Sequence, residues 1–295
     1  MLEFRDISLS DKSRAERALR QSDFRGCEYS FANNLAWRRL ADTKLTFFDG
    51  FYLLCAFNGA AHPYFTFPAG CGDIHALLRE MRIFAEHNGF PLTIGGVTDV
   101  QLRFFEESFP GMFTAEYDRD GSDYIYNSSD LIDLPGKKYH SKRNHLAKFN
   151  ELGCEFSLIS EKDFDDCIVF LTNTYNNNAD HIDDSFVAEQ FALNTYFSYF
   201  GELGLQGGIL RCDGQIIAVT IGEPVSSDTY CVHIEKADTS FNGVYAGINN
   251  CFARHCMSNY RFVNREEDLG LDGLRKAKSS YHPAFLLDKY IVTFL

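Results

Sequence analysis

The stretch LQGGILRCDGQIIAVTIGEPVSSDTYCVHIEKADTSFNGVYAG, residues 205–247, decides which fold the second half of the chain can adopt. Its apolar runs predict strands at 205–211, 215–222 and 229–236, followed by a helix that ends near residue 260. Asp213-Gly214 between the first two runs predicts a hairpin turn, and Asn242-Gly243 lies in the loop before the helix. Three consecutive strands that lead into a helix indicate an α/β protein with a mixed sheet.

Both halves of the chain have this order of elements. In the first half we expect a helix at 29–40, strands at 45–48, 51–57 and 64–67, a helix after Asp73, a strand at 91–95, a helix at 99–109, and strands at 113–117 and 124–126. In the second half we also expect helices at 162–175 and 185–200, a strand at 261–264, a helix at 271–278 and a strand at 285–294. The sequence therefore predicts an α/β (α+β) fold of two similar domains, although no residue-level repeat accompanies the repeated architecture.

The composition is that of a globular protein with an acidic surface. Of its 295 residues 45% are hydrophobic and 15% aromatic, so the chain can bury a substantial core. Its formal net charge is −13 and its sequence pI is about 5.1. Such a charge disfavours a protein that binds nucleic acid over its whole surface, so any site for a polyanion must be local.

The cysteines are scattered and contain no CxxC pair. They are Cys27, Cys55, Cys71, Cys154, Cys167, Cys212, Cys231, Cys251 and Cys256. This pattern favours reduced, mostly buried thiols over a disulfide framework or a structural zinc site. The N-terminus lacks the apolar stretch of a signal peptide, and no apolar run approaches the ~20 residues that span a bilayer. We therefore expect a soluble, cytoplasmic protein.

A basic segment, LPGKKYHSKRNHLAKFNELG, residues 134–153, separates the two halves. Leu134-Pro135-Gly136 interrupts regular structure, and the residues that follow predict a helix that Gly153 ends. The predicted organisation is an N-terminal domain at 1–133, a basic linking helix at 134–153 and a C-terminal domain at 154–295. The basic residues form either a solvated helix face or a binding site for phosphates.

Two stretches, LPGKKYHSKRNHLAKFN (134–150) and NREEDLGLDGLRKAKSSYHP (264–283), resemble the bacterial proteins related to the C-terminal domain of phosphatidylglycerol lysyltransferases. Those proteins look like tandem GNAT folds and are similar to the Fem-type aminoacyl transferases. The resemblance implies transfer of an acyl or aminoacyl group from acyl-CoA or aminoacyl-tRNA to an amine or hydroxyl. The membrane-spanning portion of the lysyltransferases has no counterpart in this sequence.

Under this resemblance, the donor contacts the loop before the helix that follows the third strand. A helix N-terminus presents unpaired N–H groups to a phosphate, and a basic helix supplies charge. The implied donor-binding residues are Lys138, Lys142, Arg143, Asn144, Asn242, Gly243, Val244, Tyr245, Gly247 and Arg275. The expected partners are a small-molecule acyl donor and an acceptor, with tRNA as the other possible donor.

Acyl transfer needs a base for the nucleophile and an acid or cation for the leaving group. Strand alternation puts His233 and Glu235 on one face, where Glu235 is a candidate base. The acids after residue 264 lie at a strand end, and Lys278 and Tyr281 follow on the next helix and turn. The catalytic candidates are Glu235, Glu267, Asp268, Lys278 and Tyr281.

Two alternatives remain open from the residues alone. The acids at 266–268 and the bases Arg275 and Lys278 are also consistent with a local salt-bridge network that only fixes a short helix. The whole protein is also consistent with a non-catalytic GNAT-fold module that binds CoA, nucleotide or RNA phosphates. No HExxH, Walker loop, GxSxG or complete dinucleotide motif occurs, and we expect no metal.

Overall fold

The computed structural model describes residues 1–176 and 184–295, and these form two compact units. Unit 1 comprises Met1–Asp123, Glu267–Gly270 and Leu286–Leu295, and unit 2 comprises Tyr124–Glu266 and Leu271–Phe285. The units therefore differ from the contiguous domains expected from the sequence. The chain passes into unit 2 at residue 124, before the basic segment, and its last residues return to unit 1.

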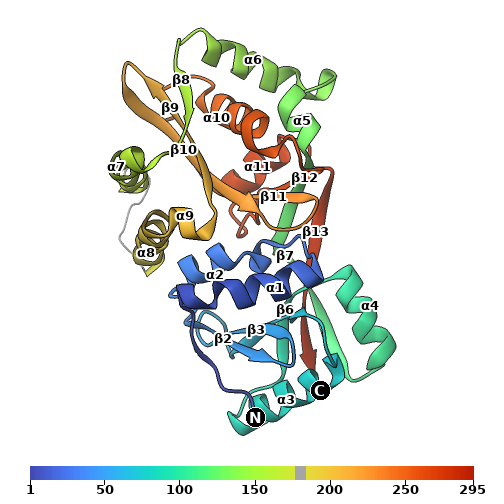
Figure 1. Ribbon diagram of the computed structural model, residues 1–295. Helices are drawn as coiled ribbons and strands as arrows, with labels where there is room; N and C mark the ends of the chain where they lie inside the picture. The colour runs from blue at the N-terminus through green and yellow to red at the C-terminus, as the bar shows by residue number, and fades with distance from the viewer. Residues whose placement is uncertain (177–183) are drawn as a thin grey trace. The chain divides into compact units, whose positions relative to one another are not determined.

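Unit 1 is built mainly from the first part of the chain (Figure 1). Its helices are α1 (Lys12–Ser22), α2 (Phe31–Trp37), α3 (Ile74–His87) and α4 (Asp99–Ser108), with 3-10 turns at Leu9–Asp11 and Cys27–Tyr29. Its strands are β1 (Arg5–Asp6), β2 (Thr43–Phe48), β3 (Phe51–Ala56), β4 (Tyr64–Thr66), β5 (Ala69–Gly70), β6 (Thr93–Thr98), the first part of β7 (Phe113–Asn127) and nearly all of β13 (Phe285–Phe294). The α3 helix begins where the sequence predicts, because the Asp73 side chain accepts a hydrogen bond from the Ala76 N–H.

The strands of unit 1 follow the order β1-β2-β3-β4-β6-β13-β7. Neighbours from β1 to β4 are antiparallel, β6 is parallel to β4, and β13 is antiparallel to β6. A hydrophobic core that includes Phe65, Leu77, Met81 and Phe105 packs α3 and α4 against these strands. The C-terminal strand contributes Val292 to the same core, so unit 1 is incomplete without the end of the chain.

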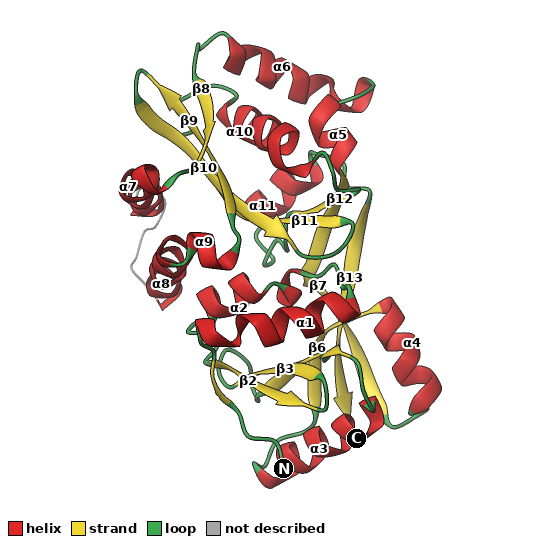
Figure 2. Cartoon of the chain, in the orientation of Figure 1, coloured by secondary structure: helices red, strands yellow, loops and turns green. Residues whose placement is uncertain are grey.

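Unit 2 holds the middle of the chain. Its helices are α5 (Ser128–Asp133), α6 (His140–Asn150), α7 (Phe164–Asn176), α8 (Asp184–Ser198), α9 (Phe200–Leu203), α10 (Val244–Phe252) and α11 (Asp272–Ser279), with 3-10 turns at Lys137–Tyr139 and Glu161–Asp163 and a π-helical turn at Ala253–Met257. Its strands are β8 (Glu155–Leu158), β9 (Gln206–Cys212), β10 (Gln215–Pro224), β11 (Thr229–Ala237), β12 (Phe262–Asn264) and the last residues of β7. The helices α7, α8 and α9 lie on one side of β9 and β10, and α10 with α6 lies on the other (Figure 2).

The strands of unit 2 follow the order β7-β12-β11-β10-β9-β8. The pairs from β8 to β11 are antiparallel, and β12 is parallel to β11 but antiparallel to β7. Both units therefore contain antiparallel strands, a crossover helix and a parallel strand, with β4, α3 and β6 in unit 1 and β11, α10 and β12 in unit 2. The repeat of architecture predicted from the sequence is present.

The basic segment is folded into unit 2, where α6 packs on α10. Phe149 of α6 belongs to a hydrophobic cluster with Val244 and Ile248. A Cβ at Gly247 would lie 2.6 Å from the Phe149 ring, and a Cβ at Gly243 would meet the His145 carbonyl. Both glycines are therefore required by the close approach of these two helices.

Three local expectations need correction. The strands predicted at 113–117 and 124–126 are parts of the single strand β7, and the helix predicted at 29–40 is a 3-10 turn followed by the shorter α2. The helix α1 was not predicted from the sequence. Most of its residues are polar, and its buried residues Ala15, Ala18 and Leu19 form too short an apolar pattern to be recognised.

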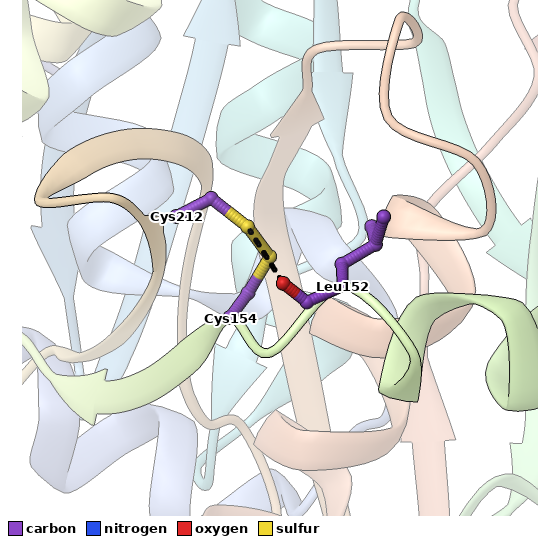
Figure 3. Close-up of a disulfide and its surroundings, with 3 residues drawn as sticks. All are labelled: Leu152, Cys154 and Cys212. Atoms are coloured by element: carbon purple, nitrogen blue, oxygen red, sulfur yellow. Dashed lines mark hydrogen bonds between the residues drawn. A yellow bond between two sulfur atoms is a disulfide. The ribbon is translucent and has the colours of Figure 1, made fainter.

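The expectation of reduced thiols is wrong for one pair of cysteines. Cys154 and Cys212 form a disulfide between the start of β8 and the end of β9, where the Cys212 sulfur lies 4.0 Å from the Leu152 carbonyl oxygen (Figure 3). The other cysteines are free, and most of them are buried, as predicted. None of the helices within 1–176 and 184–295 is long and apolar enough to cross a membrane.

The disulfide predicts a measurable thiol count and a measurable stability. The bond joins residues separated by 58 positions, and a loop of that length stabilises the folded state by up to about 4 kcal/mol in the chain-entropy treatment. We expect Ellman titration of the unfolded, unreduced protein to give seven thiols, rising to nine after reduction. Cys154→Ser with Cys212→Ser should lower the urea midpoint, whereas Cys251→Ser should not. Nine thiols before reduction would contradict the bond.

Candidate functional site

The sheet of unit 2 opens where β11 and β12 part. The two strands are paired only from Thr229 with Phe262 to Cys231 with Asn264. Beyond this point β11 continues to Ala237, while β12 ends. The residues after β12 stay attached to β7 instead, because the Arg265 N–H donates to the Tyr124 carbonyl at 3.0 Å and the Tyr124 N–H donates to the Glu266 carbonyl at 3.1 Å. Polar side chains gather at this opening, as is common at the carboxyl ends of parallel strands.

A β-bulge in β11 lies beside the opening. Ile234 pairs with Ile221, but Val232 pairs with the adjacent residue Gly222, so His233 is one residue more than the partner strand provides. A bulge changes the direction of the side chains on either side of it. The regular alternation assumed from the sequence therefore does not hold at this position.

His233 and Glu235 contact helices on different sides of the sheet. The His233 ring stacks on the Tyr196 ring of α8, with centroids 6.0 Å apart. The Glu235 carboxylate accepts a hydrogen bond from Asn249 Nδ2 of α10 at 3.1 Å. The prediction that both residues share one face is wrong, and the opening carries two separate polar clusters.

The first is the arginine cluster, on the α10 side. Arg265 Nη2 lies 2.7 Å from Glu235 Oε1, and both side chains are almost completely buried. The Arg265 guanidinium lies 4.9 Å from the centre of the Tyr281 ring and 5.6 Å from that of Tyr126. Burial opposes the charge on Arg265, but the Glu235 carboxylate together with Tyr126 and Tyr281 outweighs it, so the pKa of Arg265 is raised.

Two buried polar atoms of the arginine cluster lack a hydrogen-bond partner within the described part of the chain. They are Arg265 Nη1, a donor, and Asn249 Oδ1, an acceptor. Buried polar atoms are almost always paired, with protein, water or a ligand. An unsatisfied donor and an unsatisfied acceptor on two side chains that bond the same Glu235 carboxylate are therefore suited to a polar group of a bound molecule.

Lys142 of α6 completes the arginine cluster. Its ammonium lies 3.8 Å from the centre of the Tyr281 ring. Burial, together with the nearby charge of Arg265, lowers the pKa of Lys142 to about 8. Lys142 can therefore exchange a proton near neutral pH, whereas burial raises the pKa of the Tyr281 phenol and keeps it protonated.

The second is the histidine cluster, on the α8 side. His233 Nδ1 lies 2.9 Å from Glu266 Oε1, and His233 Nε2 lies 3.3 Å from Glu223 Oε1. Cys231 Sγ lies 3.9 Å from the same Glu266 oxygen. Burial acts against a charged imidazole, but Cys231, Tyr196 and the hydrogen bond with Glu223 outweigh it, so the pKa of His233 is raised.

A third group, the lysine cluster, belongs to unit 1 and contains the predicted catalytic residue Glu267. Buried Lys289 Nζ lies 2.8 Å from Asp123 Oδ1 and 2.9 Å from Glu28 Oε2. Cys27 Sγ lies 3.4 Å from Asp123 Oδ1 and 3.4 Å from Glu267 Oε2. Burial raises the pKa of the Cys27 thiol, and Asp123 adds to this effect, so the thiol stays protonated.

Asp268, also predicted as catalytic, shapes a turn in unit 1. It is completely buried, pairs with Arg119 at 3.2 Å and accepts a hydrogen bond from the Gly270 N–H at 2.9 Å. Leu269 between them has a φ of +52°, in the left-handed region. The contacts of Asp268 stabilise the turn at residues 267–270, and this structural role explains why an acid is present there.

The remaining catalytic candidates lie in unit 2, around the C-terminal end of α11. Lys278 is buried, with Nζ 5.9 Å from the centre of the Tyr124 ring, and its carbonyl accepts a hydrogen bond from Tyr126 Oη at 2.8 Å. Tyr281 is buried in the arginine cluster. Half-buried Arg275, a predicted donor residue, lies one turn before Lys278 on α11. The structure thus brings Glu235 and Tyr281 together in one cluster, and Glu267 into another.

The predicted donor loop lies at the N-terminus of α10. Gly243 begins the helix with a φ of +82°, and Val244 and Gly247 are covered by the hydrophobic packing against α6. Asn242 and Tyr245 are exposed. The close approach of α6 explains both glycines without a phosphate, so among the predicted donor-binding residues of this loop only Asn242 and Tyr245 are exposed to a ligand.

The predicted donor-binding residues Lys138 and Asn144 are exposed, Lys138 just before α6 and Asn144 on it. Lys138 Nζ lies 3.5 Å from Asp130 Oδ2, and Asn144 Nδ2 lies 3.3 Å from His140 Nε2. Exposed pairs of this kind contribute little to stability and remain available to a ligand.

Arg143 has a structural contact. Its Nη1 donates to the carbonyls of Leu134 and Gly136, at 2.5 Å and 2.7 Å. Leu134 has a φ of +47° and Gly136 a φ of +73°, so Arg143 fastens the turn that precedes α6.

Several residues of the opening were not selected from the sequence. They are Tyr126, Glu223, Cys231, Asn249 and Arg265. Arg265 carries the clearest signal, because a basic residue directly after a buried strand and directly before acids is unusual for a solvated face. The others become recognisable only when strands and helices that are distant in sequence come together.

The chain matches the protein family described as "Phosphatidylglycerol lysyltransferase, C-terminal" over residues 19–293. An uncharacterised protein of Mycoplasmoides gallisepticum is 25% identical over 208 residues, which are 68% of this chain and 64% of that protein. The matched part thus spans less than two thirds of that relative's length.

A solved structure of a conserved protein of unknown function from Bacteroides thetaiotaomicron is 37% identical, with a TM-score of 0.94 and full coverage of both chains. FemX is 9% identical, with a TM-score of 0.65 and coverage of 99% and 97%. A tandem GNAT protein from the clavulanic acid biosynthesis pathway is 10% identical, with a TM-score of 0.52 and coverage of 100% and 98%. The last two share the fold alone, and they confirm the predicted tandem GNAT-like architecture.

The lowered pKa of Lys142 predicts a pH-dependent stability. The folded protein releases the Lys142 proton near pH 8, whereas the unfolded chain retains it until about pH 10.5. Between these values the unfolded state binds more protons, so stability contributed by this residue rises with pH. We expect the melting temperature of the wild type, relative to Lys142→Met, to increase across this window. For Lys148→Met, an exposed change on α6, the difference in melting temperature from the wild type should not change with pH. A difference that does not change with pH for Lys142→Met would exclude the lowered pKa of Lys142.

The buried pair of Arg265 and Glu235 predicts a large loss of stability on breaking it. Glu235→Gln leaves a buried guanidinium without its carboxylate, which costs about 3–5 kcal/mol. Arg265→Met combined with Glu235→Leu should cost less, because both charges are removed. Glu189→Gln, which breaks the more exposed pair with Lys236, should cost about 1 kcal/mol or less. Urea unfolding measures all three, and equal losses for Glu235→Gln and Glu189→Gln would refute this account.

Proposed function

This chain belongs to the phosphatidylglycerol lysyltransferase C-terminal family, and from that membership we propose that it is a GNAT-type acyltransferase. In this proposal it moves an acyl or aminoacyl group from acyl-CoA or aminoacyl-tRNA to an amine or hydroxyl acceptor. Both donors are cytoplasmic molecules, so the proposal includes that location. The reaction is assigned to the opening between β11 and β12 of unit 2.

The observation that carries the proposal is the pair of unsatisfied atoms in the arginine cluster. Transfer of an acyl group develops negative charge on the carbonyl oxygen, which a buried donor stabilises strongly. Arg265 Nη1 is such a donor, and Asn249 Oδ1 can accept from the attacking or departing group. Lys142, with its pKa lowered to about 8, is the proposed proton-exchanging residue.

The donor's phosphates are assigned to the exposed residues near α6 and the start of α10. Lys138, Asn144 and Asn242 are exposed there, and Tyr245 is exposed by 39%. A CoA moiety needs few phosphate contacts, whereas tRNA uses several. The acidic net charge of −13 favours the smaller donor.

A second function, a binding module without catalysis, is favoured by one specific observation. Glu235, the expected base, is held by Arg265 at 2.7 Å and by Asn249 at 3.1 Å. Both oxygens of this carboxylate already accept a hydrogen bond, so the carboxylate is poorly placed to take a proton from an acceptor. If Lys142 does not exchange the proton, the same cluster is left as an anion-binding site.

Calorimetric titration with CoA and acetyl-CoA, followed by turnover with a panel of amines, tests the proposal. We expect saturable binding that weakens about tenfold in Lys138→Met, the size of one lost charged hydrogen bond, and stays unchanged in Lys148→Met. Release of free CoA thiol with an amine supports the transferase, and binding without release supports the module.

The same titration with aminoacyl-tRNA separates the donors. Binding that falls steeply between low and moderate salt indicates several phosphate contacts and selects tRNA. Absence of binding by every donor, in a protein that melts cooperatively, would overturn the proposed function.

A further inference from the structure

We propose that the histidine cluster of unit 2 is a zinc site, in which Cys231, His233 and Glu266 bind the ion. From the sequence we expected no metal, because no HExxH motif occurs and the histidines are dispersed. The inference does not depend on the proposed transferase activity. It rests on the positions of the donor atoms and on the way the fold holds them.

The three donor atoms are close enough to share one ion. They all lie within 4.8 Å of one another, with 2.9 Å between His233 Nδ1 and Glu266 Oε1 and 3.9 Å between Cys231 Sγ and that oxygen. Ligand atoms around a tetrahedral zinc are about 3.3–3.6 Å apart, given bonds of about 2.0–2.3 Å. The nitrogen–oxygen and sulfur–oxygen distances in this cluster each lie within about half an ångström of that range.

Two strands supply the donors, and the backbone fixes them. Cys231 and His233 both lie on β11, and His233 is the bulged residue whose side chain the bulge turns towards the other donors. Glu266 follows β12 with a φ of +58°, and its N–H donates to Asn264 Oδ1 at 2.7 Å. A non-glycine residue in the left-handed region is strained, and such strain is concentrated at binding and catalytic sites.

A second carboxylate orients the imidazole. Glu223 Oε1 lies 3.3 Å from His233 Nε2, and the Tyr196 ring stacks on the imidazole at 6.0 Å. With the proton on Nε2 and donated to Glu223, the Nδ1 lone pair is directed at Cys231 and Glu266. A carboxylate bonded to the distal nitrogen of a metal-bound histidine is the usual supporting arrangement at zinc sites.

The donor set selects the metal. One sulfur, one nitrogen and one carboxylate oxygen suit Zn²⁺, and three protein ligands leave a fourth position for water or the second Glu266 oxygen. Cys231 and His233 are buried, so an ion would be shielded from solvent.

The lysine cluster of unit 1 makes an internal contrast. It also groups three donor residues, Cys27, Asp123 and Glu267. There, however, Lys289 Nζ lies 2.8 Å from Asp123 Oδ1 and 3.7 Å from Cys27 Sγ, so an ammonium of the chain itself occupies the position near these donors. We therefore assign zinc to the histidine cluster and not to the lysine cluster.

The test is metal content and a cobalt spectrum on the full chain, purified without a histidine tag. After zinc loading and dialysis we expect one zinc per chain. After replacement by Co²⁺ we expect visible bands of a tetrahedral ion and a near-ultraviolet thiolate-to-cobalt band. Cys231→Ser and His233→Ala should lose the ion, whereas Cys256→Ser and Cys27→Ser, which change buried free thiols elsewhere, should retain it.

Glu266→Gln keeps the side-chain volume and should shift the cobalt spectrum. This variant tests the site even if Cys231→Ser and His233→Ala fail to fold. A wild-type protein that retains no zinc and shows no thiolate band would overturn the proposal, leaving a protonated His233 between two carboxylates. Loss of the band in Cys27→Ser but not in Cys231→Ser would also overturn it, because the ion would then lie in the lysine cluster.

Discussion

The separation of β11 from β12 is the constraint on which the organisation of unit 2 depends. Parallel pairing lasts from Thr229 to Cys231 on one strand, and the residues after β12 bond to β7 instead. Beyond Cys231 the pairing of β11 with β12 ends. The side chains of β11 there contact the side chains of the residues that follow β12, as Glu235 does with Arg265 and His233 with Glu266. The α10 helix covers one side of the opening and α8 the other. Asn249 of α10 therefore joins the arginine cluster, and Tyr196 of α8 stacks on the histidine cluster.

Each buried acid of these clusters is balanced by a different kind of positive charge. Glu235 is balanced by the guanidinium of Arg265, and Asp123 and Glu28 by the ammonium of Lys289. At His233 the charge must come from a proton or from a metal ion. A guanidinium and an ammonium are permanent parts of the fold, whereas a proton or a metal ion can be exchanged with solvent. In the histidine cluster, therefore, the charge that balances the carboxylates is itself exchangeable.

Local structure was largely predictable from the sequence, because it depends on neighbouring residues. The Asp73 cap, the Asp213-Gly214 turn and the strand-strand-strand-helix order all follow from residue types at fixed spacing. The Cys154–Cys212 bond was not predictable, since nine scattered cysteines give no pairing. Glu235 and Tyr281 were found as polar residues at element ends, but Arg265, which links them, was found only in the folded structure. Gly243 and Gly247 were interpreted as a phosphate loop, although helix packing alone explains them.

The order of strands in unit 1 has a consequence for synthesis. The last ten residues of regular structure form β13, which lies between β6 and β7 and carries Lys289 and Val292 into the interior. Synthesis runs from the N-terminus, so the sheet formed by the N-terminal segments keeps a place vacant between β6 and β7 until β13 has been made. All the helices of unit 2 and its strands β8 to β12 lie between the two parts of unit 1 in the sequence. The half that is begun first therefore depends on a segment that follows the strands of the other half.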